Sequence, residues 1–267
     1  MPTPYPAETL LIEGADAIAF AQAQFSSKVS SLATGQWQFG AWLDPQGRVR
    51  AFFHLARLAD DRLLLLLRGG SAATMADALR RFVFRSKLTL TALPSRSLTT
   101  GHARPMHAVD GNTETLLLGC GTYSMQVTTA AHDDSAWHLT QLREGWPWLP
   151  AQALNELLPP ALSLHRLQAV AIDKGCYPGQ EIVARLHYRG GNKRHLHHVF
   201  LSQAVSIGSV LRSDEHEIGR VIDAVNTDVG IEALAVLNDD VVAQSVNGRL
   251  NELHEHLVVQ IDNTWPA

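Results

Sequence analysis

The chain has few cysteines and no long hydrophobic run. Cys120 and Cys176 are its only cysteines in 267 residues, which is too few for a disulfide framework and is typical of a reducing compartment. The five consecutive leucines at residues 63–67 fall far short of the roughly 20 apolar residues that a membrane-spanning helix needs. The first Lys or Arg is Lys28, so the N-terminal residues make a poor signal peptide. We therefore expect a soluble cytoplasmic protein with no membrane partner.

Charge is also scarce. Charged residues make up 18% of the chain and the formal net charge is −4, which argues against a protein that coats nucleic acid, because such a protein needs a broadly basic surface. Hydrophobic residues make up 46%, enough to bury a core, and the length suits one large or two modest domains. Direct nucleic-acid binding therefore stays open only at a local basic segment.

Most of the recognisable chemistry lies in residues 172–194. Glycines stand on both sides of Cys176, and Pro178 suits the first turn of a helix, where a missing N–H costs nothing. The pattern predicts a tight loop and then a short helix, with Cys176 just ahead of the helix N-terminus. That position and the charge of Lys174 would both stabilise a thiolate. We interpret Cys176 as a functional thiol and Cys120, which has no such neighbours, as structural.

The second half of this segment, residues 185–194, is basic, and we call it the basic turn. Four cations surround a pair of glycines, with no acidic residue in the segment after Glu181: Arg185, Arg189, Lys193 and Arg194. Such a cluster is either a solvated surface or a site for a polyanion. Carboxylate and nucleic-acid phosphate both match the planar donors of arginine.

Two further groups of residues allow more than one interpretation. On a strand, His195 and His197 share a face, but no carboxylate or cysteine nearby completes a ligand set. We expect these residues and His198 to lie at a surface or an interface, and we predict no metal site. Trp146 and Trp148 stand next to prolines. Both suit core packing, and Trp146 also suits stacking on a flat ligand.

Apolar periodicity predicts an α+β chain in two parts. The N-terminal part is expected to form helices after Asp16 and Ser71, and strands at 9–12, 36–43, 49–58, 62–68, 84–90, 116–118 and 137–145. Beyond Arg194, short strands separated by turns predict a small antiparallel barrel. These strands are expected at 195–200, 210–211, 218–225, 232–236, 242–246 and 257–261. We place a domain boundary near Arg194.

One octapeptide resembles a known family signature. It is Lys174-Gly175-Cys176-Tyr177-Pro178-Gly179-Gln180-Glu181, which is similar to the Lys-Gly-Cys-Tyr-x-Gly-Gln-Glu of the YgfZ-type folate-binding proteins. These proteins are relatives of the glycine-cleavage T-protein, an aminomethyltransferase. A match of this length is more specific than a lone glycine motif. Further segments resemble the family in the same order along the chain: 14–24, 79–88, 145–147, 183–185, 189–194, 208–210 and 218–221.

The resemblance implies an α+β, T-protein-like folate-binding fold. A folate-binding region at 1–194, with a ferredoxin-like portion at about 42–95, would precede a C-terminal antiparallel β-barrel domain at 195–267. The implied ligand is tetrahydrofolate or a one-carbon-substituted folate. The implied role is auxiliary, in iron–sulfur cluster assembly or repair and in tRNA modification. The implied partners are iron–sulfur enzymes or their assembly machinery.

The resemblance also implies a set of site residues, with Cys176 as the functional thiol. Gln180 and Glu181 would orient the loop and contact the pterin, and Arg185, Arg189 and Lys193 would hold an anionic group, either the glutamate tail of a folate or a nucleic-acid phosphate. The implied folate-binding residues are Lys174, Tyr177, Gln180, Glu181, Arg185, Arg189, Lys193 and Trp146. Two alternatives stay open. One is a folate-dependent aminomethyltransferase, although no carboxylate here matches that enzyme's pattern, and the other is a folate-independent scaffold that docks a client protein through the basic turn.

Overall fold

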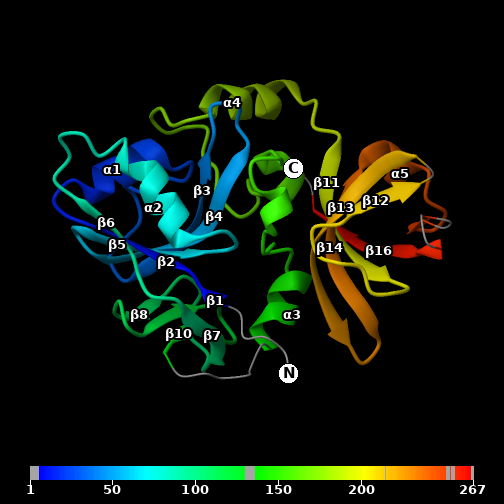
Figure 1. Ribbon diagram of the computed structural model, residues 1–267, viewed down its shortest axis with the longest axis horizontal. Coiled ribbons are helices and arrows are strands. Elements are labelled where there is room, and N and C mark those ends of the chain that lie inside the picture. The colour runs from blue at the N-terminus through cyan, green and yellow to red at the C-terminus, as the bar shows by residue number, and fades with distance from the viewer. Residues whose placement is uncertain (1–5, 130–135, 214, 251–252, 254–255, 266–267) are drawn as a thin grey trace.

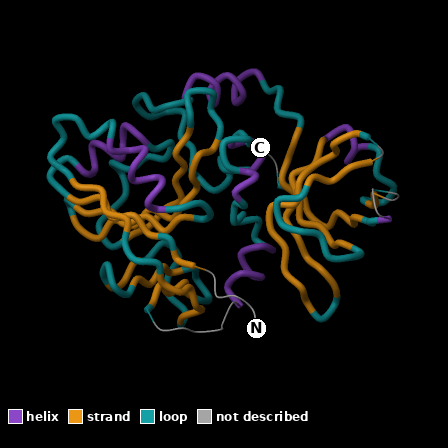
Figure 2. Tube along the Cα trace, in the orientation of Figure 1, coloured by secondary structure: helices purple, strands orange, loops and turns teal. Residues whose placement is uncertain are grey.

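Three antiparallel sheets surround a central column of helix and loop. The computed structural model describes residues 6–129, 136–213, 215–250, 253 and 256–265. The column consists of α3 (Ala136–Arg143) and residues 146–170, and α4 (Gln180–Arg189) crosses above it (Figures 1 and 2). Within the described ranges, no helix has the length and apolar character to cross a membrane.

The first sheet has the strand order β3-β4-β5-β2-β6 and explains the run of leucines. On β5, Leu63 and Leu65 pack with the helices α1 and α2, while Leu64 and Leu66 join the central core. Successive side chains of a strand point to opposite faces, so a strand covered on both sides is apolar throughout. The elements are β2 (Thr9–Glu13), α1 (Ala17–Gln24), β3 (Gln36–Leu43), β4 (Val49–Ala59), β5 (Arg62–Leu67), α2 (Ala72–Arg80) and β6 (Thr89–Ala92).

Apart from β1, the second sheet comes from the part of the sequence with the weakest periodicity, and only its strand β9 is predicted. Its order is β1-β7-β10-β9-β8. It is tied to the first sheet by the Trp37 indole of β3, which donates to the Gly119 carbonyl at 2.9 Å. The strands are β1 (Pro6–Ala7), β7 (Arg96–Gly101), β8 (Val109–Gly111), β9 (Leu116–Gly119) and β10 (Ser124–Thr128).

The C-terminal sheet is antiparallel, as expected, but it is an open half-barrel and not a closed barrel. Its order is β12-β13-β14-β11-β16-β15, and the two edge strands β12 and β15 are only four and two residues long. In a closed barrel the two edge strands would pair and complete the core. Here the core is completed by side chains of the short helix α5 and by two loop leucines. The elements are β11 (Arg194–Leu201), β12 (Val210–Ser213), β13 (His216–Thr227), β14 (Gly230–Asn238), α5 (Asp239–Ala243), β15 (Arg249–Leu250) and β16 (Val259–Thr264).

Three other expected strands are wrong in whole or in part. The segment 137–145 forms α3, because its buried side chains recur at helical rather than strand spacing: Trp137, His138, Gln141 and Leu142. The start of 242–246 belongs to α5, where two acidic residues occupy the first turn and favour a helix N-terminus. The strand expected from residue 84 begins only at Thr89.

Neither the ferredoxin-like portion nor the domain boundary follows from these elements. The segment 42–95 supplies β4, β5 and β6, with the helix α2, to a sheet whose other strands, β2 and nearly all of β3, come from outside the segment. The ferredoxin-like portion is therefore not confirmed. β11 begins at Arg194, next to the predicted boundary. The division into 1–194 and 195–267 stays a prediction.

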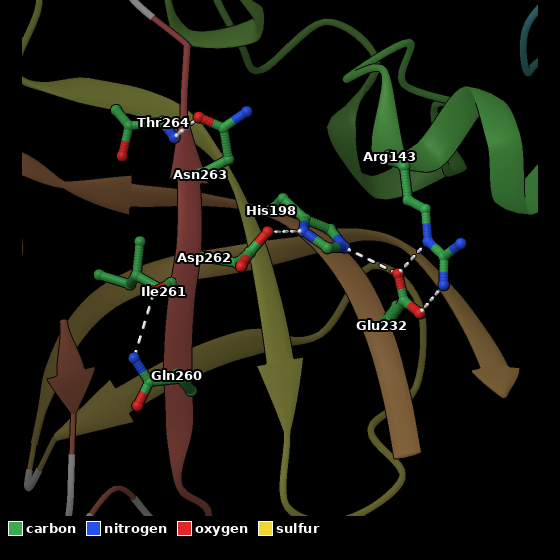
Figure 3. Close-up of polar contacts among 8 residues, drawn as sticks. All are labelled: Arg143, His198, Glu232, Gln260, Ile261, Asp262, Asn263 and Thr264. Atoms are coloured by element: carbon green, nitrogen blue, oxygen red, sulfur yellow. Dashed lines mark hydrogen bonds and ion pairs between the residues drawn. The ribbon is translucent and has the colours of Figure 1, made fainter. Parts of the chain in front are cut away.

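An ion network centred on the buried Glu232 fixes α3 to the C-terminal sheet (Figure 3). Glu232 of β14, with 1% of its side chain exposed, accepts hydrogen bonds from Arg143 Nε at 2.7 Å and from Nη2 at 2.5 Å. His198 Nε2 lies 3.1 Å from the same carboxylate, and His198 Nδ1 lies 2.9 Å from Asp262 Oδ2. Because the residues come from α3, β11, β14 and β16, the network sets how the column meets this sheet.

Candidate functional site

The signature loop is anchored by Lys174. Its ammonium donates to the carbonyl oxygens of Gln22 at 2.6 Å, Phe25 at 2.6 Å and Ser27 at 2.9 Å, at the end of α1 and just beyond it. Burial lowers the pKa of Lys174 to about 8. The sequence predicts that the Lys174 ammonium stabilises a Cys176 thiolate. In the structure this ammonium is instead directed at three backbone carbonyls, and Cys176 is exposed.

Two more residues of the signature complete this anchor. The Tyr177 hydroxyl donates to the Ala171 carbonyl at 2.9 Å, and its buried ring lies with its centroid 5.2 Å from Lys174 Nζ. Gln180 Nε2 donates to the Lys174 carbonyl at 3.1 Å. Lys174, Tyr177 and Gln180 are thus brought together, and the polar atoms named here are engaged by the protein's own backbone.

Gly179 joins the loop to the turn between β3 and β4. It precedes α4 with φ of +79°, and a Cβ placed there would lie 2.5 Å from the Asp44 carbonyl oxygen. Gly179→Ala combines this clash with a left-handed backbone, so we expect it to lower the free energy of unfolding by about 2 kcal/mol. Urea denaturation measures this change.

Gly175, on the other side of Cys176, provides the matched control. A Cβ at Gly175 would meet nothing within 4 Å, and its φ lies outside the left-handed region. We expect Gly175→Ala to change the free energy of unfolding by less than about 0.5 kcal/mol. Equal losses in the two variants would contradict the role given to Gly179.

The outer face of α4 carries the remaining residues of the expected site. Glu181, Arg185 and Arg189 are exposed there, and together with Tyr188 they line a shallow hollow of about 440 Å³. Lys193 is exposed beyond the helix. In the described part of the chain, Arg194 of the basic turn pairs with Glu217 at 3.3 Å, while Arg185, Arg189 and Lys193 have no ion pair.

The histidines beyond the basic turn are bound within the C-terminal sheet. His195 Nδ1 lies 2.6 Å from Asp239 Oδ1, and His197 Nδ1 lies 2.9 Å from Thr264 Oγ1, while His198 belongs to the ion network. Among the described residues, no group of three or more His, Cys, Asp or Glu side chains is arranged to hold a metal ion.

Trp146 lies in a second place, an aromatic cluster between the first sheet and the column. Only 8% of it is exposed, and its ring centroid lies 5.1 Å from that of Phe39 and 6.2 Å from that of Trp37. Among the described residues, the rings that contact Trp146 therefore belong to β3, and the signature loop contributes none of them. We call this group, with His54, Arg68 and Glu144, the central cluster.

Arg68 holds the central cluster together from the end of β5. It is fully buried, and it donates from Nε to the Pro147 carbonyl at 2.9 Å, from Nη1 to Gln141 Oε1 at 2.7 Å and from Nη2 to the Trp146 carbonyl at 2.6 Å. Burial lowers the pKa of Arg68 to about 10, so the guanidinium stays charged at neutral pH. It links the first sheet to α3 and to the start of the column's loop.

The central cluster contains buried polar atoms that have no hydrogen-bond partner among the described residues. These atoms are both ring nitrogens of His54 and Glu144 Oε2. Burial holds the pKa of His54 well below its usual range, so the ring is neutral, and burial raises the pKa of the Glu144 carboxyl although Arg166 and Arg68 oppose this. Unpaired buried polar groups are rare and costly.

Sequence reasoning did not find His54, Arg68 or Glu144. His54 sits in an apolar strand, where a lone histidine gives no signal, and Arg68 ends the run of leucines. Glu144 next to Gly145 was the available hint, because it lies beside the segment that resembles the family at 145–147. These side chains meet only in the folded chain.

Comparison with known proteins gives relatives and a fold. No family model matches the chain. It is 30% identical over 252 residues to an uncharacterised protein of Haemophilus influenzae, covering 90% of this chain and 89% of that one. It is 27% identical over 240 residues to the tRNA-modifying protein YgfZ of Vibrio vulnificus, covering 79% and 72%. The YgfZ of Sodalis glossinidius is 25% identical over 276 residues, covering 88% and 84%.

A solved structure shares the fold. The glycine cleavage system aminomethyltransferase T from Bartonella henselae superposes with a TM-score of 0.67, covering 96% of this chain and 82% of that chain. The sequence identity is 15%, so this likeness shows the architecture alone.

Proposed function

We propose, from the premise that this chain belongs to the YgfZ-type family of aminomethyltransferase-like proteins, that it is a tetrahydrofolate-binding auxiliary protein. Its role would lie in iron–sulfur cluster assembly or repair and in tRNA modification. The names of its relatives support the link to tRNA modification. The shared fold with a glycine-cleavage enzyme supports a folate-related role.

The assignment of the ligand rests on Glu144 Oε2 in the central cluster, a buried atom for which the described part of the chain provides no hydrogen-bond partner. A pterin presents N–H donors along one edge of a flat ring, and a carboxylate accepts such donors by charge-assisted hydrogen bonds. The neutral His54 offers a further donor and an acceptor, and the rings of Trp37 and Trp146, 1% and 8% exposed, pack beside it. The hydrogen-bonding groups present therefore suit the edge of a pterin, which would have to part these buried rings to reach them. Bound folate would supply a carrier for a one-carbon unit.

The outer face of α4 would serve the other end of the ligand or a partner protein. The cations Arg185, Arg189 and Lys193, which have no ion pair within the described ranges, suit the carboxylates of a glutamate tail. Cys176 is exposed and would present its thiol to an iron–sulfur client or its assembly machinery. In this arrangement, Lys174, Tyr177 and Gln180 position the loop, and Glu181 borders the cationic face.

The test is titration with tetrahydrofolate, followed by tryptophan fluorescence, of the wild type and Glu144→Gln. Loss of charge-assisted hydrogen bonds should weaken binding about 30-fold. Cys176→Ser is the control, because an exposed thiol outside the central cluster should not alter the affinity. Saturable binding that Glu144→Gln leaves unchanged would contradict the assignment of Glu144, and turnover of an aminomethyl donor would favour the aminomethyltransferase instead.

The pH dependence follows from the raised pKa of Glu144. Only the ionised carboxylate accepts from the pterin without donating a proton of its own, and burial holds the pKa of Glu144 above the usual 4.5. Affinity should therefore fall as pH drops through this raised pKa, and it should recover at higher pH. The pH profile of Glu144→Gln serves as the control, because it contains the titration of tetrahydrofolate itself but not that of Glu144. If the affinities of wild type and variant change with pH in parallel, the Glu144 carboxylate is not the source of the pH dependence.

A further inference from the structure

The turn that follows α2 exposes two phenylalanines among cations. Residues 80–87 read Arg-Arg-Phe-Val-Phe-Arg-Ser-Lys, and we call them the aromatic–basic turn. Phe84 is 79% exposed and Phe82 is 40% exposed, whereas every other phenylalanine in the described residues except Phe200 is buried. Two rings left in water next to a well-packed core indicate a surface that meets a partner.

The charges of this turn are free for an anion. Arg80 pairs with Asp77, but Arg81, Arg85 and Lys87 have no ion pair in the ranges that the structure describes. The Asp16 carboxylate, which touches the turn, accepts the Lys87 backbone N–H at 2.7 Å. Arg50 of β4 lies close enough to Arg81 for the two charges to repel, and this repulsion, after burial, lowers the pKa of Arg50. The positive charge of the turn therefore continues onto β4.

Each exposed ring is paired with a guanidinium. The Cζ of Arg81 lies 5.0 Å from the Phe82 ring centroid, and the Cζ of Arg85 lies 5.1 Å from that of Phe84. A flat ring beside a planar cation offers one nucleotide both a stacking surface for its base and a donor for its phosphate. The turn is also held in shape, because the Ser86 N–H donates to the Val83 carbonyl at 2.9 Å.

We propose that the aromatic–basic turn binds single-stranded RNA, with bases stacked on Phe84 and Phe82 and phosphates held by Arg81, Arg85 and Lys87. The inference rests on the proposed function in tRNA modification for its choice of RNA. Unpaired bases are required, since a base within a duplex cannot stack on a side chain. An acidic peptide would use the cations but leave the rings without a matching partner.

Fluorescence anisotropy of a labelled single-stranded decauridylate tests the proposal on the full chain. Phe84→Leu keeps an apolar side chain but removes the stacking surface, and it should weaken binding about 10-fold. Arg81→Ala with Lys87→Ala should reduce the magnitude of the slope of log affinity against log salt by about 1.4, because each cation releases about 0.7 counterions from a single strand.

The matched control removes an exposed cation and an exposed apolar side chain from the C-terminal sheet. Arg249→Ala with Val229→Ala, of which Val229 is 81% exposed, should leave RNA affinity unchanged. A duplex of the same length should bind the wild type at least about 10-fold more weakly than the single strand.

Other outcomes would overturn the proposal. Wild-type affinity in Phe84→Leu would mean that no base stacks on the ring. Tighter binding to phosphatidylglycerol vesicles than to RNA would assign the turn to a membrane. Tetrahydrofolate titration of the same variants keeps the two proposals apart: lost RNA binding with intact folate binding supports this surface, and a wild type that binds folate but no RNA overturns this inference alone.

Discussion

Glu232→Ala is expected to lower the free energy of unfolding by about 3 kcal/mol. The substitution removes the carboxylate on which Arg143 and His198 converge (Figure 3). His198, with 5% of its side chain exposed, would keep Asp262 as the partner of Nδ1 but lose the partner of Nε2. Because 54% of the Arg143 side chain reaches solvent, we take the low end of the range for a broken buried pair. Urea denaturation at neutral pH measures the change.

The same sheet contains an exposed pair that serves as the control. Arg194 and Glu217 lie 3.3 Å apart with 43% and 35% of their side chains exposed. Exposed pairs contribute little, so Glu217→Ala should lower the free energy of unfolding by less than about 1 kcal/mol. Similar losses in the two variants would show that burial of Glu232 is not what makes its ion network important.

The effect of Glu232 should depend on pH in a stated direction. The hydrogen bond from Arg143 holds the pKa of Glu232 below the usual 4.5. A group whose folded pKa is depressed contributes stability above its unfolded pKa, and that contribution is lost as pH falls through the folded pKa. The difference between wild type and Glu232→Ala should therefore be constant near neutrality and shrink below pH 4.5. A difference that persists in acid would rule out the ionised carboxylate as its source.

Local sequence signals predicted the signature loop but not its electrostatics. The left-handed glycine at 179 and the presence of a helix after the loop follow from local backbone preferences, but α4 begins only at Gln180, so Pro178 lies ahead of the first turn in which it was expected. The carbonyls that hold the Lys174 ammonium belong to Gln22, Phe25 and Ser27, about 150 positions earlier. No local pattern could show that the end of α1 and the residues just beyond it bind the Lys174 ammonium. Whether Lys174 stabilises a Cys176 thiolate could therefore not be judged from the sequence.

The larger errors have the same cause. Alternation correctly predicted most strands of the C-terminal sheet, but closure depends on whether the edges β12 and β15 meet, and in the structure they do not. In α3, a short apolar–polar alternation suited a strand or a helix equally well. The structure adopts the helix, in which Trp137 and Leu142 are both buried. The central cluster joins β4, β5 and the end of α3, and no single segment contains its pattern.

Arg68→Met is expected to be the second large loss, about 3 to 4 kcal/mol in the free energy of unfolding. Methionine fills much of the same volume, but three buried acceptors lose their donor: the carbonyls of Trp146 and Pro147, and Gln141 Oε1. Since these atoms fix the column's loop against the first sheet, tetrahydrofolate binding by the folded fraction should also weaken. Urea denaturation and fluorescence titration give the two readouts.

Arg62, at the other end of β5, is the control that distinguishes the effect of losing a buried guanidinium from the effect of losing any arginine. Its ion pair with Glu13 is exposed on both sides, at 44% and 36%, so Arg62→Met should cost less than about 1 kcal/mol and leave folate binding unchanged. A stable Arg68→Met variant would mean that the acceptors find other donors. Weakened folate binding in that stable variant would then show that the Arg68 charge, rather than the order it imposes, supports the ligand, either directly or by opposing the raised pKa of Glu144.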